Sequence, residues 1–180
     1  MFKTLALLAL ACSSTVMSTQ YSRAIARTGG DQVSGEFIFY NKRVASDSNA
    51  LQLQLDVTIK GMVPNSNYYY HVHVLPVPAN GSCTATLGHF DPTGNNKMDG
   101  KYKCDPKNIT GTCEYGDLTG YEGAATVAKA GDVYTASYGL QYLSLDSESA
   151  NSIIGRSVVI HNSMDVRISC GNIITVTRKC

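Results

Sequence analysis

The stretch Tyr68–Pro92, which reads YYYHVHVLPVPANGSCTATLGHFDP, decides how this chain is interpreted. It contains His71, His73 and His89, three of the four histidines in the 180-residue sequence. Because successive side chains of a β-strand point to opposite faces, His71 and His73 are expected to share one face of a strand. Two imidazoles side by side on a rigid element are typical of a metal site. The alternative is a pair of exposed strand histidines that bind nothing.

The fourth histidine, His161, ends the apolar run Ile153–His161. Four histidines suit copper, zinc, iron or nickel. A cupin-type iron site would place a glutamate shortly after the His-x-His pair, but Leu75–Pro78 follows here, which weakens that interpretation. Structural zinc sites normally use cysteine, whereas a hydrolytic zinc site with three histidines remains an alternative.

Short strands are predicted on both sides of this stretch. Leu51–Ile59, LQLQLDVTI, alternates apolar and polar residues almost perfectly, which indicates a half-buried strand. No segment has a convincing helical period. The other segments with a strand-like pattern are Gly35–Tyr40, Tyr68–Val74, Ala124–Ala128, Val133–Tyr138, Ile153–His161 and Ile173–Thr177, with a hairpin-type turn at Ala130–Asp132.

The span Leu75–Glu122 breaks this pattern. It is rich in Pro, Gly, Asn and Asp, contains three cysteines and has no amphipathic period. A loop of this length in a compact domain is usually functional. Several short strands with turn signals and one long functional loop predict an all-β, antiparallel Greek-key β-sandwich or barrel.

The chain is predicted to contain one folded domain, residues 34–180, after a loose lead-in at 21–33. Residues 1–20 resemble a secretory signal peptide, with the cut between 11 and 20 and an apolar run too short to span a bilayer. The surroundings of Cys12 offer a lipoprotein cleavage site as a lesser alternative. A formal charge of +1 gives no sign of nucleic acid or an anionic membrane as a partner.

Five cysteines lie beyond the expected signal peptide, and in a secreted chain they predict disulfides with one thiol left over. Their pairing does not follow from spacing alone. Asn80 and Asn108 each begin an acceptor sequence for N-glycosylation, which matters if the source is eukaryotic. The five cysteines are Cys83, Cys104, Cys113, Cys170 and Cys180.

Four motifs together resemble the copper/zinc superoxide dismutase family. They are HVHVLPVPANGSCTATLGHFDP at 71–92, GDLTG at 116–120, IIGRSVVIH at 153–161 and RISCGNI at 167–173, and the similarity covers about residues 34–178. The resemblance implies a Greek-key β-barrel and a copper enzyme that converts superoxide to dioxygen and hydrogen peroxide.

The resemblance also implies roles for single residues. His71, His73 and His161 match copper ligands, and His89 matches the histidine that bridges copper to zinc and takes up a proton in the reduced state. Arg167 matches the arginine that guides the anionic substrate toward copper.

The same comparison implies that Cys83 and Cys170 form the disulfide that ties the long loop to the barrel. A second bridge, between Cys104 and Cys113, is predicted inside that loop. Asp117 matches the family's zinc-binding aspartate and is expected to lie behind the copper ligands; the simpler interpretation is that Asp117 caps a turn.

Two features depart from the family pattern. No histidine lies between His89 and Asp117, where the family has two further zinc ligands, and only Asn162–Val166 separates His161 from Arg167. These departures are similar to those of the copper-only superoxide dismutases secreted by fungi and oomycetes. In that subgroup a glutamate at the position of Glu114 hydrogen-bonds the bridging-type histidine, although Glu114 could also be a solvated loop charge.

The sequence therefore predicts a secreted, copper-only superoxide dismutase with one copper per chain, no zinc, no membrane span and a monomeric state. The alternative is a secreted copper-binding or copper-buffering domain without turnover, since a fold alone does not give a function. Arg167 discriminates between them, because copper storage needs no guide for an anion; its own alternative is an ordinary surface arginine. A zinc hydrolase is a third possibility, but it lacks an obvious general base.

Overall fold

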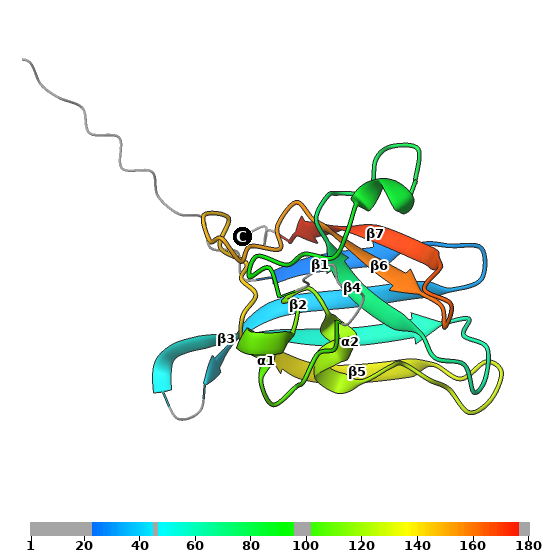
Figure 1. The fold of residues 1–180 in the computed structure, drawn as a ribbon, viewed down its shortest axis with the longest axis horizontal. Helices are drawn as coiled ribbons and strands as arrows, with labels where there is room; N and C mark the ends of the chain where they lie inside the picture. Colours follow the sequence, from blue (N-terminus) through cyan, green and yellow to red (C-terminus); the bar gives the residue numbers. More distant parts are fainter. Residues whose placement is uncertain (1–22, 45–46, 96–101, 177–180) are drawn as a thin grey trace, which may run out of the picture.

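The computed structural model describes residues 23–44, 47–95 and 102–176, and it forms one antiparallel sheet of seven strands. The sheet curls into a partial barrel in the order β4-β6-β7-β1-β2-β3-β5 (Figure 1). The predicted all-β antiparallel class is therefore confirmed. The strands are β1 (Arg23–Thr28), β2 (Ser34–Val44), β3 (Asp47–Lys60), β4 (Tyr69–His73), β5 (Tyr134–Leu140), β6 (Ser157–His161) and β7 (Arg167–Thr175).

The predicted signal peptide and Cys180 lie outside the described residues. The loose lead-in predicted for residues 21–33 is wrong in part, because Arg23–Thr28 within it forms β1. β1 pairs with β2 along its whole length and with β7 at Ala24–Ala26. The small side chains of Ala24 and Ala26 are fully buried between these strands. The arginines favoured a loop in the sequence, but Arg23 and Arg27 are the exposed residues of a short strand that is otherwise buried.

Two further expectations change in detail. Ala124–Ala128 forms no strand and makes only an isolated bridge between Tyr68 and Ala125, although Ala125 and Val127 are buried as the alternation predicts. The span Leu75–Glu122 is irregular as expected, but it includes three short helical segments where no helix was predicted. These segments are η1 (Thr84–Thr86), α1 (Ile109–Thr112) and α2 (Leu118–Glu122).

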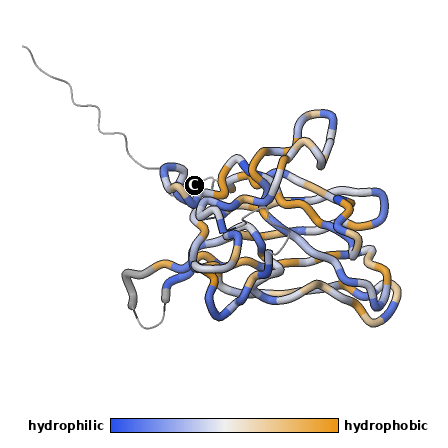
Figure 2. The backbone as a smooth tube through the Cα atoms, in the orientation of Figure 1, coloured by the Kyte–Doolittle hydropathy of each residue, from blue (hydrophilic) through white to orange (hydrophobic). Residues whose placement is uncertain are grey.

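The core follows from the alternation of apolar and polar residues in β2 and β3. Phe37 and Phe39 face inward with Leu55, Val57 and Ile59, all of them at most 2% exposed, while the residues between them are partly exposed. Hydrophilic residues gather mainly in the turns at the ends of the strands (Figure 2). Burial of these large side chains supplies the main stabilisation of the fold.

β7 connects the part of the sheet formed by β4 and β6 to the part formed by β1, β2, β3 and β5. Its first part pairs with β6 and its last part pairs with β1. Gly171 lies at this change of partner, where an added Cβ would be 2.0 Å from the backbone oxygen of Arg27. A glycine is needed here because β1 and β7 approach so closely.

The register of β4 and β6 decides where the histidines point. Tyr69 pairs with His161, and His71 pairs with Val159, so these side chains share one face. Tyr70 and Ile160 are also paired, and they face the core on the other side. His71, His73 and His161 therefore lie on the face away from the core, beneath the long loop.

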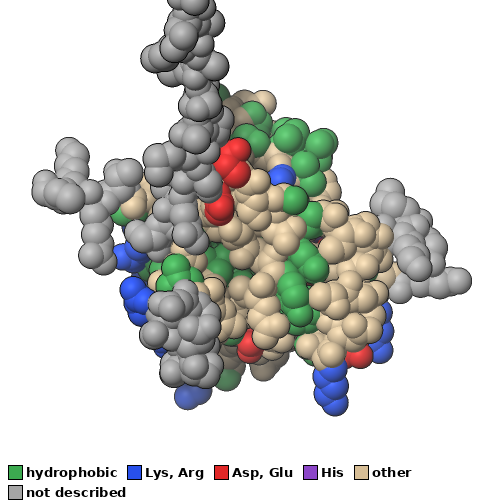
Figure 3. All heavy atoms as spheres, turned by 90° about the vertical axis from the view of Figure 1, so that its left-hand side faces the viewer, with side chains coloured by type: hydrophobic (Ala, Val, Ile, Leu, Met, Phe, Trp, Pro, Cys, Tyr) green, Lys and Arg blue, Asp and Glu red, His purple; other side chains and the backbone are tan. Residues whose placement is uncertain are grey.

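No helix among residues 23–44, 47–95 and 102–176 has the length and hydropathy that crossing a membrane would require. On the face of the molecule in Figure 3, acidic and basic side chains are scattered and no histidine is visible.

Candidate metal centre

The four histidines of the chain meet in one cluster. One ring nitrogen from each of His71, His73, His89 and His161 lies within 4.8 Å of the other three. His73 and His161 are at most 2% exposed and His71 is 6% exposed, while His89 is partly exposed. β4 supplies His71 and His73, β6 supplies His161 and the long loop supplies His89, so the fold brings together residues that are far apart in the sequence.

The loop brings His89 to β4 through three backbone hydrogen bonds. The Phe90 amide donates to the Val72 carbonyl, the Gly116 amide donates to the Phe90 carbonyl, and the Val72 amide donates to the Gly116 carbonyl, each at 2.8 Å. A Cβ on Gly116 would lie 2.6 Å from the Val72 oxygen, so only glycine fits there. These three hydrogen bonds hold His89 over His71, and the two rings stack with their centroids 3.8 Å apart.

Two of the imidazoles have one nitrogen against a buried carboxylate. His89 Nδ1 lies 2.5 Å from Glu114 Oε2, and His71 Nε2 lies 3.3 Å from Asp117 Oδ1. Glu114 is 2% exposed and Asp117 is 7% exposed, so neither is a solvated loop charge. The contact between Glu114 and His89 is the one that the sequence predicted; the contact between Asp117 and His71 was not predicted.

The other two imidazoles also have one nitrogen against an oxygen. His73 Nδ1 lies 2.9 Å from the carbonyl oxygen of Leu87 and 3.1 Å from Thr86 Oγ1. His161 Nδ1 lies 2.8 Å from Asp165 Oδ1 and 3.3 Å from the Asp165 carbonyl. Every ring therefore has a place to donate one N–H outward, which leaves its second nitrogen with a lone pair.

The remaining nitrogens converge on one point. His71 Nδ1 is buried and has no hydrogen-bond partner, and His73 Nε2 lies 3.2 Å from His161 Nε2. Two imidazole lone pairs at that separation repel each other unless a proton or cation lies between them, and a buried nitrogen without a partner is costly. The four histidines fit a copper-type ion, for which imidazole is a suitable ligand.

The protonation of the cluster agrees with metal binding. Burial lowers the pKa of His71, lowers the pKa of His73 to about 2 and lowers the pKa of His161 to about 4. These three rings are therefore neutral near pH 7, and a histidine must be neutral to ligate a metal.

The Asp117 side chain makes two kinds of contact, one with the backbone of α2 and one with a histidine ring. The side chain caps α2 by accepting from the Gly120 amide at 2.8 Å, as the simpler interpretation of the sequence predicted, and it also faces His71. Burial raises the pKa of Asp117, but hydrogen bonds from His71 and Tyr102 outweigh this effect and lower the pKa to about 2. The carboxylate is therefore ionised and acts as an acceptor.

Arg167 lies beside the cluster rather than free on the surface. Its guanidinium donates to the carbonyl oxygens of Cys83 and Thr84 at 3.0 and 3.1 Å. Thr86 Oγ1 is 3.4 Å from the same nitrogen and 3.1 Å from His73 Nδ1, so Thr86 connects the cation to the histidines. The positive charge is held in place next to the site.

Two disulfides anchor the long loop. Cys83 is bonded to Cys170 on β7, and Cys104 is bonded to Cys113 inside the loop. The first bridge fixes the carbonyl that Arg167 contacts, and the second immediately precedes Glu114. Both bridges therefore support residues of the site.

Sequence reasoning missed Asp165 and the Leu87 carbonyl. Asp165 has a φ of 59°, in the left-handed region that aspartate tolerates better than most residues, and this turn aims its carboxylate at His161. The sequence did contain a signal for Asp165, because it lies four residues after His161 in the short connection Asn162–Val166, close enough to fold back onto the ring. It contained no signal for the Leu87 carbonyl, because every residue has a backbone oxygen.

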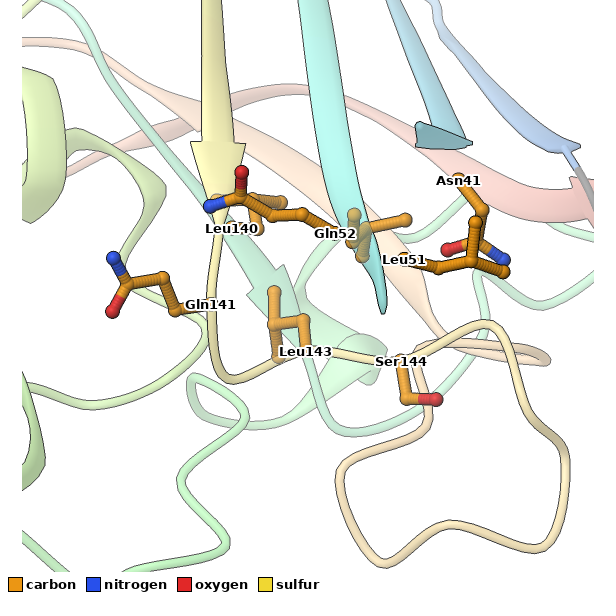
Figure 4. A pocket seen from close by; sticks show the side chains of 8 residues that line it. Asn41, Leu51, Gln52, Leu140, Gln141, Leu143 and Ser144 are labelled. Carbon is orange, nitrogen blue, oxygen red and sulfur yellow. The ribbon is translucent and has the colours of Figure 1, made fainter. Parts of the chain in front are cut away.

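A separate pocket of about 360 Å³ lies at the ends of β3 and β5. Leu51, Leu140, Gln52 and Gln141 are among the side chains that line it, and none of its lining residues is ionisable (Figure 4). It therefore offers no group for acid–base or metal chemistry.

The chain is similar in sequence and in fold to proteins of one known family. Residues 33–173 match the family described as copper/zinc superoxide dismutase. The chain is 32% identical over 147 residues to cell surface superoxide dismutase [Cu-Zn] 6 of Candida albicans, a match that covers 81% of this chain and 42% of the relative. It is 34% identical over 123 residues to cell surface Cu-only superoxide dismutase 5 of the same organism, which covers 67% of this chain and 48% of the relative.

These alignments span less than half the length of both fungal relatives. The solved structure of Candida albicans superoxide dismutase 5 with Cu(II) superposes with a TM-score of 0.68 at 28% identity, covering 89% of this chain and 95% of that one. The superoxide dismutase [Cu-Zn] of Onchocerca volvulus is 30% identical over 144 residues, covering 80% of this chain and 77% of the relative. With the family match over residues 33–173, this chain belongs to the copper/zinc superoxide dismutase family.

Proposed function

We propose that this chain is a secreted, copper-only superoxide dismutase that converts superoxide to dioxygen and hydrogen peroxide. The observation that carries the proposal is the arrangement of the four imidazoles, each with one nitrogen against an oxygen acceptor and the other directed into a shared site. The names of the fungal relatives, which include Cu-only superoxide dismutases, support it.

In this proposal the ligands are His71 Nδ1, His73 Nε2, His161 Nε2 and the Nε2 of His89. Copper, when bound, supplies one-electron oxidation and reduction of superoxide. Glu114 would keep the N–H of His89 on Nδ1 and hold the ring in place. His89 Nε2 would be a ligand in the oxidised state and, when it is not bound to copper in the reduced state, would hold a proton that is later given to the product. The partly exposed position of His89 allows that proton to exchange with water.

Arg167 is the group that attracts the substrate. Superoxide is a small anion, and a guanidinium fixed beside the cluster draws it in and orients it. A copper-storage domain has no need of such a cation next to its site, which is why catalysis is favoured over copper buffering.

We propose copper without zinc. Among the residues that the structure describes, only one group of histidine, cysteine or acidic side chains has metal-ligand geometry, and it is the four-histidine cluster. Glu114 and Asp117 are already engaged with His89 and His71, and together with one shared histidine they do not complete a tetrahedral zinc site. We propose a monomer with one copper; all four ligands and Arg167 come from one chain, so no second chain is needed to complete the site.

We also propose that the protein acts outside the cell or at its surface. The fungal relatives are named as cell surface proteins, and two disulfides are typical of an oxidising compartment. Asn80 and Asn108 are exposed, as an N-glycosylation acceptor must be.

The test is metal analysis of the purified protein together with superoxide decay, measured before copper is removed, after removal and after copper is restored. We expect about one copper per chain, no stoichiometric zinc, and activity that is lost and regained with copper. Copper binding without superoxide decay would instead support the buffering domain, and zinc bound at one equivalent beside copper would contradict the copper-only assignment.

A further inference from the structure

A single tyrosine hydroxyl joins the two carboxylate residues that face the histidine cluster. Tyr102 donates to Asp117 Oδ2 at 2.9 Å, and the backbone amide of Glu114 donates to the Tyr102 oxygen at 3.0 Å. Burial and the nearby Asp117 carboxylate raise the pKa of Tyr102, so the hydroxyl keeps its proton. The hydroxyl thus uses its donor on one carboxylate residue and its acceptor on the other.

Each of these carboxylates contacts a different imidazole. Asp117 uses its other oxygen, Oδ1, toward His71 Nε2, and Glu114 Oε2 contacts His89 Nδ1. His71 and His89 are stacked on each other, so a shift of either carboxylate changes the angle between two neighbouring rings. One hydroxyl is therefore connected, through the Asp117 carboxylate and the Glu114 backbone, to half of the histidine set.

The chain holds Tyr102 in place through the smaller disulfide. Cys104 lies two residues after Tyr102, and Cys113 immediately precedes Glu114, so their bond brings the two segments together. This bridge and the hydrogen bond from the Glu114 amide act on the same pair of segments. The placement of the hydroxyl is thus fixed from two sides.

We propose that Tyr102 is a positioning residue for the metal centre: its hydroxyl locks Glu114 and Asp117 in the orientations that hold the His89 and His71 rings for copper. This inference rests on the proposed copper function. Tyr102 does not contact the metal, and its effect is transmitted through the Asp117 carboxylate and the backbone of Glu114. Loss of the hydroxyl would leave the Glu114 amide and Asp117 Oδ2 without these partners in a largely buried setting.

The test compares Tyr102→Phe with Tyr121→Phe. Tyr121 lies in α2, and its hydroxyl donates to the Tyr115 carbonyl at 2.9 Å rather than to a carboxylate. Both changes delete one phenol hydroxyl from the same loop region and keep the ring. The quantities measured are Cu(II) affinity by chelator competition, the parallel hyperfine splitting in the Cu(II) EPR spectrum, and the melting temperature of the copper-free protein.

Tyr102→Phe should weaken Cu(II) binding by about tenfold, which is the lower end of the range for groups that position a metal-binding residue without touching the metal. It should also alter the hyperfine splitting. Tyr121→Phe should change affinity less than twofold and leave the spectrum unaltered. A double variant, Cys104→Ser with Cys113→Ser, should alter the spectrum in the same direction as Tyr102→Phe, because it releases Tyr102 while keeping its hydroxyl.

The role of Tyr102 is overturned if Tyr102→Phe gives the wild-type affinity and spectrum, or if Tyr121→Phe gives the same changes as Tyr102→Phe. A wild-type protein that binds no copper refutes the proposed function instead. In that case amide hydrogen exchange in the copper-free protein still tests the contact: the Glu114 amide should exchange at least tenfold faster in Tyr102→Phe, and unchanged exchange would refute the locking role.

Discussion

At the scale of single residues, the centre depends on which nitrogen of each imidazole faces an oxygen. An imidazole with one nitrogen fixed as a donor presents the other as a lone pair of fixed direction. His71 has its Nε2 against a carboxylate, whereas His73, His89 and His161 have their Nδ1 against an oxygen. In the proposed copper site His71 would therefore ligate through the opposite ring nitrogen from the other three, and its unpartnered Nδ1 agrees with this.

Replacing the two carboxylates separates their contributions. Glu114→Gln should weaken Cu(II) binding or turnover by about 10–100-fold, because an amide is a weaker acceptor for the His89 N–H than a carboxylate. Asp117→Asn should do less to copper directly, since its contact with His71 is longer, 3.3 Å against 2.5 Å. Cu(II) affinity and superoxide decay would be measured side by side, and a larger loss in Asp117→Asn would reverse this ranking.

Arg167→Ala tests the attraction of the anion. Turnover should fall at least several-fold while the copper spectrum stays nearly unchanged, because Arg167 contacts the loop carbonyls and not the convergent nitrogens. The difference from wild type should shrink as salt rises, since screening weakens attraction at a distance.

The matched control for this prediction is Arg27→Ala. Arg27 lies on β1, where it pairs with Glu36 at the surface, so the variant loses the same charge away from the site. Equal turnover in the two variants would mean that net charge, rather than a guide beside the cluster, sets the rate.

The residue scale is also where prediction from sequence was least complete. The four histidines, Glu114 and Arg167 stood in motifs, and the structure brings them together. Tyr102 and Asp165 did not, because their roles depend on contacts between irregular segments that follow no period. Side chains on loops are placed by distant hydrogen bonds and disulfides, and short-range patterns do not contain that information.

At the scale of the elements, the strand period was enough to predict which histidines share a face. The two-residue spacing put His71 and His73 on one side of β4, and the β4–β6 register adds His161 to it. β1 was missed because its two alanines are weak strand signals, and its burial comes from β2 and β7 on either side. Alternation predicted burial correctly at Ala125 and Val127, but it did not predict that this segment stays outside the sheet.

The two disulfides should differ in what they contribute to stability. Cys83 and Cys170 are 87 residues apart, and the chain-entropy model gives about 4–5 kcal/mol for a loop of that length. Cys104 and Cys113 are 9 residues apart, for which the same model gives about 2–3 kcal/mol. Removal of the first bridge by paired serine substitutions should therefore lower the free energy of unfolding more.

Urea unfolding of the copper-free double-serine variants measures this difference, and each variant is the control for the other. Equal losses, or a larger loss at the shorter loop, would show that local packing outweighs the entropy of the unfolded chain. Peptide mapping that joins Cys83 to any cysteine other than Cys170 would contradict the pairing itself.

At the scale of the whole molecule, the buried histidines make the folded state of the copper-free protein sensitive to acid. In the unfolded chain these rings titrate near pH 6.5, whereas burial lowers the pKa of His73 to about 2 and of His161 to about 4, and lowers that of His71 as well. Below about pH 6.5 the unfolded chain binds protons that the folded chain does not accept. Stability therefore falls with falling pH.

The expected result is a free energy of unfolding that is nearly flat above about pH 7 and falls below it by up to about 1.4 kcal/mol per pH unit for each such histidine. Urea unfolding of the copper-free protein at steps from pH 7.5 to 5 measures this slope. In His73→Gln the unfolded chain has one titrating ring fewer. Below pH 6.5 the free energy of unfolding of this variant should therefore fall less steeply with pH, by the contribution of about one proton. A free energy of unfolding that is constant or rises as the pH falls from 7 to 5 would mean that the cluster accepts protons in the folded state, and that these histidines are not held neutral for a metal.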